Sequence, residues 1–170
     1  MDQLVGLHDS VANCKGMMPS VINELFHHRA NPRFLLVLTC SFAELLVGTM
    51  IEEHCKNGKQ INSNSRDFSF SVRLVLLREM NLLDDSSFTR LNWLRKRRNS
   101  AAHDPGFRFT KDMIPEWAGK LHTSADDLFS ICVNVIGPIW NSNTELFLRQ
   151  LPVENSFSDV SHDNYKIKKL

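Results

Sequence analysis

Apolar residues recur at helical spacing along most of the chain, and no segment alternates apolar and polar residues as a half-buried strand would. The longest apolar run follows Pro32, a residue that suits the first turn of a helix, and it predicts a helix over residues 32–54. A shorter helix precedes it, with Ser20 as the expected N-cap and an apolar face made by Val21, Ile22, Leu25 and Phe26.

The rest of the chain continues the helical pattern. Helices are predicted over residues 69–81, over 87–102 after the capping cluster Asp84-Asp85-Ser86-Ser87, from Pro115 to 121, over 124–136 and over 139–151. Residues 60–65 are predicted to be a polar loop, and Gly137-Pro138 is predicted to break or kink the helix there. We therefore expect an all-α bundle of about five to seven helices in one domain over residues 1–151, followed by a polar, flexible tail over 152–170.

Composition narrows the class of protein without identifying it. The chain has 170 residues, 42% hydrophobic and 23% charged, with a net charge of +1, so no global field marks a nucleic-acid binder. The four cysteines lack C-x-x-C spacing, so neither a zinc site nor a disulfide framework is expected, and no cofactor is indicated (Cys14, Cys40, Cys55, Cys132). The N-terminus lacks a basic region followed by an apolar core, which favours the cytoplasm.

Residues 34–51 raise the alternative of a membrane span, because this apolar run approaches the length that crosses a bilayer. Glu44 lies near its centre, and a lone carboxylate at mid-bilayer costs about 3 kcal/mol on insertion scales. We therefore expect a helix buried in a soluble bundle, with no membrane partner.

Residues 95–104 contain the candidate chemistry. On a helical wheel Arg98 shares a face with Phe88, Leu91, Leu94 and Ala101, so it is predicted to point inward. Arg95, Lys96 and Arg97 are predicted to face solvent, or phosphates if RNA binds. An inward guanidinium needs an anionic partner, and Glu44, a carboxylate in another apolar helix, is predicted to approach it. This contact would be either a structural ion pair or the support of a catalytic arginine.

His103 follows Arg98 by five residues, which sets the two about 140° apart around a regular helix. They converge only if the helix loosens at Ala101-Ala102 or if a two-fold axis joins two copies. Otherwise His103 is simply a favourable charge at a helix C-terminus. Asn99 would contact a phosphate or face water, and Asp104 would orient His103 or start the turn into Pro105.

The segment Arg98-Asn99-Ser100-Ala101-Ala102-His103 resembles the R-x4-H signature of the HEPN superfamily, including the asparagine after the arginine. Residues 70–77, 81–94 and 109–114 are also similar to the mannitol-operon repressor family, so the resemblance spans about residues 34–136. In that family glycine is usual before Leu82, where this chain has Asn81. The resemblance implies a small bundle of long helices, generally a homodimer that brings two motifs together.

Two functions from different classes follow from the resemblance. Many HEPN proteins are metal-independent ribonucleases of toxin–antitoxin or antiviral systems, which implies Arg98 and His103 as catalytic residues, with support from Asn99, Glu44 and Asp104. Others, including members of the repressor family, bind a transcription factor, a nucleotide or RNA without cutting it. The first function implies RNA as substrate and an antitoxin as partner, and the second implies a regulatory protein partner. A helical assembly module without a ligand is a third alternative.

Overall fold

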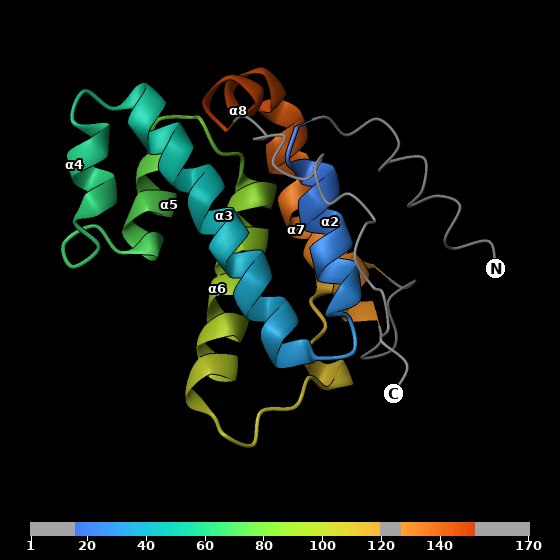
Figure 1. Cartoon of the computed structure of the whole chain (residues 1–170). Coiled ribbons are helices and arrows are strands. Elements are labelled where there is room, and N and C mark those ends of the chain that lie inside the picture. The colour runs from blue at the N-terminus through green and yellow to red at the C-terminus, as the bar shows by residue number, and fades with distance from the viewer. Residues whose placement is uncertain (1–15, 120–126, 152–170) are drawn as a thin grey trace, which may run out of the picture.

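A computed structural model describes residues 16–119 and 127–151, and these residues form seven α-helices and two 3₁₀ turns without a strand (Figure 1). The predicted all-α bundle is therefore confirmed. The polar tail predicted over 152–170 and the parts of two predicted helices at 120–121 and 124–126 lie outside the described residues. The elements are α2 (Met18–His27), α3 (Pro32–His54), α4 (Gly58–Ser63), α5 (Phe70–Glu79), α6 (Asp85–His103), η1 (Lys111–Met113), η2 (Glu116–Ala118), α7 (Leu128–Ser142) and α8 (Thr144–Gln150).

Helix α3 is the centre of the bundle and contacts each of the other six α-helices. It begins at Pro32, as predicted, because the Asn31 side chain accepts the Phe34 amide N–H at 3.1 Å and caps the first turn. By length and composition α3 could cross a membrane, and 61% of its most apolar 18-residue window is buried inside the bundle. A core helix of a globular protein has these same properties.

Helix α6 runs antiparallel to α3 and packs along it (Figure 1). Its N-cap is Asp84, whose carboxylate accepts both the amide and the hydroxyl of Ser87 at 2.8 Å. The helix therefore begins at Asp85, two residues before the predicted start. Its C-terminal end lies beside the N-terminal end of α3, since Arg33 of α3 bonds to the chain just after His103.

The polar loop predicted over residues 60–65 is wrong, because α4 occupies residues 58–63. Gly58 is buried against the end of α3, and a Cβ there would lie 2.3 Å from the Ile51 carbonyl oxygen. From α4, Asn62 donates to Glu52 at 2.7 Å and accepts from Arg73 at 2.6 Å. These tertiary contacts stabilise α4 as a short polar helix. Its residues lack apolar side chains at helical spacing, so the sequence pattern alone predicts a loop.

The break predicted at Gly137-Pro138 is also wrong, because α7 continues through both residues to Ser142. Pro138 has no N–H to donate to the Asn134 carbonyl one turn earlier. That carbonyl instead accepts Arg90 Nη1 of α6 at 2.9 Å. The neighbouring helix thus satisfies the group that proline leaves open, and α7 needs no break.

Three boundaries differ for local reasons. Helix α2 begins at Met18, ahead of the predicted cap Ser20, and no side chain caps it. Helix α5 ends at Glu79, because Asn81 adopts a left-handed conformation with φ of 57°. Asparagine tolerates this region better than most residues, so Asn81 can end the helix here. The helix predicted from Pro115 is a single 3₁₀ turn in the described part of the segment.

Candidate functional site

The guanidinium of Arg98 on α6 lies 3.9 Å from the carboxylate of Glu44 on α3, which confirms their predicted approach. The two side chains are 36% and 34% exposed, so the pair lies at the edge of the core and not inside it. Arg98 Nη1 also donates to the side-chain oxygen of Asn99 at 3.2 Å. A guanidinium held by two neighbours but open to solvent is free to contact an anion.

Cys40 lies behind this pair, one turn before Glu44 on α3, and its thiol approaches the carboxylate at 3.7 Å. Burial raises the pKa of the Cys40 thiol to about 12, and the charge of Glu44 adds to this effect, while Arg98 and Arg95 oppose it. The thiol is therefore protonated at neutral pH and is a packed core group, as its apolar surroundings predict. The i, i+4 spacing of Cys40 and Glu44 was a usable sequence signal for their contact.

The predicted division of the basic cluster is only partly correct. Lys96 is exposed, as expected, but Arg95 and Arg97 are half-buried, like Arg98. Arg95 donates twice to the Asn92 side-chain oxygen, at 3.2 and 2.9 Å, so its guanidinium lies along α6. A helical wheel predicts only the direction in which each side chain leaves the helix. The long side chains of Arg95 and Arg97 then fold back onto the protein surface, so they are half-buried although the wheel directs them to solvent.

Arg97 lies near the segment that follows α6, close enough to Asp112 to affect its pKa. The pKa of Asp112 is lowered mainly by a hydrogen bond with the Thr110 side chain and by its own backbone N–H, and Arg97 contributes to the same shift. The Nε atom of Arg97 is buried without a hydrogen-bond partner in the structure. Arg97 therefore faces the segment after α6 and is less available to a phosphate than Lys96.

The end of α6 is a regular helix through His103, and the Asp104 amide N–H still donates to the Ser100 carbonyl at 3.0 Å. The helix does not loosen at Ala101-Ala102, so Arg98 and His103 point in different directions within one chain. His103 is exposed. The Asp104 carboxylate accepts the Gly106 amide at 2.8 Å, which is the turn-forming alternative for this residue.

Arg33 is a residue of this region that the sequence did not single out. Its Nη2 atom donates to the main-chain carbonyls of Asp104 and Pro105, at 2.6 and 2.9 Å. It thereby fixes the chain just after His103 to the start of α3 and adds positive charge at the C-terminus of α6. No sequence signal was available, since the partners are backbone atoms about seventy residues away.

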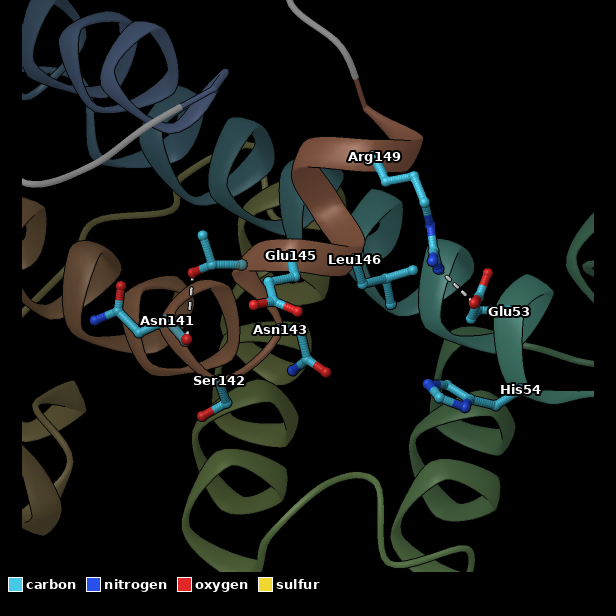
Figure 2. A pocket seen from close by; sticks show the side chains of 9 residues that line it. Glu53, His54, Asn141, Ser142, Asn143, Glu145, Leu146 and Arg149 are labelled. Atoms are coloured by element: carbon cyan, nitrogen blue, oxygen red, sulfur yellow. Dashed lines mark hydrogen bonds and ion pairs between the residues drawn. The ribbon is translucent and has the colours of Figure 1, made fainter.

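A polar cavity of about 680 Å³ lies elsewhere, where the C-terminal ends of α3 and α7 meet α8. Figure 2 shows Arg149 of α8 reaching to Glu53 of α3, with His54 at the same opening. Glu53 is nine residues beyond Glu44, about 14 Å along the helix axis. This cavity is therefore separate from the Arg98 region, and neither Arg98 nor His103 lines it.

Among the described residues, no group of three or more histidine, cysteine, aspartate or glutamate side chains is placed to hold a metal ion. No protein-family model, curated protein or solved structure matches the chain. A family assignment is accordingly a proposal that rests on the resemblance of residues 70–77, 81–94, 98–103 and 109–114.

Proposed function

We propose that this protein is a metal-independent RNA endonuclease of the HEPN type, with Arg98 and His103 acting on a phosphodiester. The observation that carries the proposal is the half-exposed Arg98, which Glu44 and Asn99 hold at the edge of the core. Exposure keeps the guanidinium hydrated while its aliphatic stem packs, which stabilises an arginine in any role. An arginine that binds phosphate needs both a fixed position and an open side.

The chemistry assigned to each residue follows from its charge and from the protons it can exchange. The 2′-hydroxyl of the RNA gives its proton to His103 as its oxygen attacks the adjacent phosphorus, and His103 returns that proton to the 5′-oxygen as the bond from phosphorus to that oxygen breaks. The products are a 2′,3′-cyclic phosphate and a 5′-hydroxyl. An imidazole can both accept and donate a proton, which suits the two transfers that we assign to His103. Arg98, supported by Asn99 and positioned by Glu44, neutralises the charge that builds on the phosphate oxygens.

The active unit in this proposal is a homodimer. A regular α6 directs Arg98 and His103 about 140° apart, so one chain cannot present both to the same phosphate. Two copies related by a two-fold axis pair Arg98 of each chain with the partner's His103. Lys96, which is exposed on α6, is available for RNA outside the scissile phosphate, with Arg95 and Arg97 as weaker contributors because both are half-buried.

A second candidate is a non-catalytic regulator, related to the repressor family, that binds a protein, a nucleotide or RNA. The separation of Arg98 and His103 along a regular α6 favours this regulator. A protein that does not form the two-fold dimer would never bring an arginine and a histidine together at one phosphate, and so would have no catalytic site. Its partner would be a transcription factor, whereas a toxin-like nuclease would pair with an antitoxin.

The deciding experiment incubates purified protein with mixed RNA in EDTA and compares Arg98→Ala and His103→Ala with wild type. Arg66→Ala is the matched control, since it removes one exposed positive charge between α4 and α5. The nuclease proposal expects each site variant to lose about 100-fold or more in rate, with the control unchanged. No cleavage by wild type in any buffer, or equal cleavage by all four proteins, would favour the regulator.

A further inference from the structure

The polar cavity where α3 and α7 meet α8 has a lining that is rich in hydrogen-bond acceptors (Figure 2). Two of its side-chain donors are already used inside the protein. Asn143 Nδ2 donates to the Ile139 carbonyl at 3.0 Å, and Thr144 Oγ1 donates to the Trp140 carbonyl at 2.9 Å. The side-chain oxygen of Asn143 and the lone pairs of the Thr144 hydroxyl therefore remain as acceptors.

The charge of the lining is negative. Among the described residues that line the cavity, Glu53 and Glu145 are acidic, and only Arg149 has a permanent positive charge. Arg149 and Gln150 donate to the two oxygens of Glu53, at 2.5 and 3.2 Å, so the charges of Glu53 and Arg149 offset each other. No residue in the described part of the chain forms an ion pair with Glu145, which is exposed. Its carboxylate is the charge that the lining leaves unbalanced.

Two helix ends add to the negative potential. Helix α3 ends at His54 and α7 ends at Ser142, and both residues line the cavity. The C-terminal end of a helix carries a partial negative charge and favours a cation. Helix α8 begins at the same place with the opposite polarity, but it has only seven residues, and Glu145 in its first turn offsets its positive end.

We propose that this cavity binds an aliphatic diamine or polyamine. An alkylammonium group is a cation with three N–H donors and no acceptor, so it complements a negative lining of acceptors. One ammonium group binds the oxygens of Glu145 and Asn143. The second binds Glu53 and His54, which Figure 2 shows across the cavity, and the methylene chain lies over Leu146 between the two sides.

The size and the arrangement of the lining favour an organic cation over a metal ion. The cavity volume of about 680 Å³ lies in the range of small-molecule sites. A metal ion needs several ligands at one point, and no three carboxylate, histidine or cysteine side chains converge in this way among the described residues. A diamine instead bridges two groups of acceptors that lie apart.

The first test follows the amide NMR spectrum of the full chain during titration with putrescine, without RNA. Wild type is expected to show saturable shifts at residues 53–54 and 141–146. Glu145→Gln is expected to weaken binding about two- to fivefold, as for a partly solvated ion pair, and Glu145→Lys is expected to abolish it. Glu116→Gln is the matched control, since Glu116 is exposed on η2 and does not line the cavity. No saturable shift in wild type, or equal binding by Glu145→Lys, would overturn the proposal, and the same spectra show whether each variant is folded.

A monoamine of the same length tests the two-ended contact. Putrescine is expected to bind about fivefold more tightly than n-butylamine, because its second ammonium group contacts Glu53. Equal affinity would contradict the diamine and assign the cavity to a single ammonium group, as a lysine side chain of another protein presents.

Amine binding at this cavity is independent of the proposed nuclease, because neither Arg98 nor His103 lines it. Arg98→Ala is therefore expected to bind putrescine as wild type does, whatever its effect on RNA cleavage. Putrescine binding by a protein that never cleaves RNA would reject the nuclease alone, and RNA cleavage by a protein that does not bind putrescine would reject the amine site alone.

Discussion

Arg98 of α6 and Glu44 of α3 lie 3.9 Å apart with about one third of each side chain exposed. A pair in this position contributes little to stability, because water screens it, and its value lies in holding the guanidinium in one orientation. Glu44→Gln should therefore change the free energy of unfolding by less than about 1 kcal/mol while lowering kcat for RNA cleavage. Urea titration and single-turnover cleavage measure the two effects. Full activity with a large loss of stability would make Glu44 a purely structural partner.

Two helix-interior glycines should respond in opposite directions to alanine. At Gly48 a Cβ would lie 2.7 Å from the Asn62 side-chain oxygen, which bonds to Arg73, so Gly48→Ala displaces this network. We expect a loss of about 1–3 kcal/mol in the free energy of unfolding, as for a broken buried hydrogen bond.

At Gly137 a Cβ meets nothing within 4 Å. Gly137→Ala should raise stability by about 0.5–1 kcal/mol, because alanine favours helix. Thermal unfolding of both variants provides the comparison, and a stabilised Gly48→Ala would show that the α4 contact is mobile.

The bond from Arg90 to the Asn134 carbonyl should matter only while Pro138 is present. Arg90→Met leaves that carbonyl without its donor and should cost about 1–3 kcal/mol. In a Pro138→Ala background the alanine N–H supplies the missing helical bond, so the same change should cost less. A double-mutant cycle measured by denaturant unfolding gives the coupling. Strictly additive costs would mean that Arg90 stabilises α6 through Trp117, whose ring lies 5.2 Å from its guanidinium carbon, and not through α7.

Asp84 should give a pH-dependent contribution to stability. Its pKa is lowered below the ordinary value of 3.8, chiefly by the hydrogen bond from the Ser87 amide. A carboxyl with a depressed folded-state pKa adds stability above the unfolded value, and this is lost as the pH falls through the folded value. Asp84→Ala should cost about 1 kcal/mol at pH 7, and the difference from wild type should shrink below the ordinary pKa. A constant difference across that range would assign the effect to packing.

The sequence predicts best where one element determines its own structure. The apolar run after Pro32 and the capping aspartates before α6 are local signals, and both helices form where these signals place them within two residues. The predictions fail where contacts with another element determine the structure. Helix α4 forms because Gly58 packs against α3 and Asn62 bonds to Arg73 of α5. Helix α7 continues through Pro138 because Arg90 of α6 bonds to the carbonyl that the proline cannot reach. In the site, the Glu44–Arg98 contact was predictable because each is an unpaired charge on an apolar face. The bond from Arg33 to the end of α6 was not, since its acceptors are backbone carbonyls.

The composite site is tested most directly by mixing two inactive variants. Arg98→Ala and His103→Ala chains, carrying different tags, are co-expressed, and the mixed dimer is compared with each variant alone. If Arg98 acts with the partner's His103, each mixed dimer regains one intact site, and a random mixture should recover about one quarter of wild-type RNA cleavage. If both residues act from the same chain, every site in the mixture lacks one of them. Recovery confirms the account, and a mixed dimer as inactive as its parents, beside an active wild type, would contradict it.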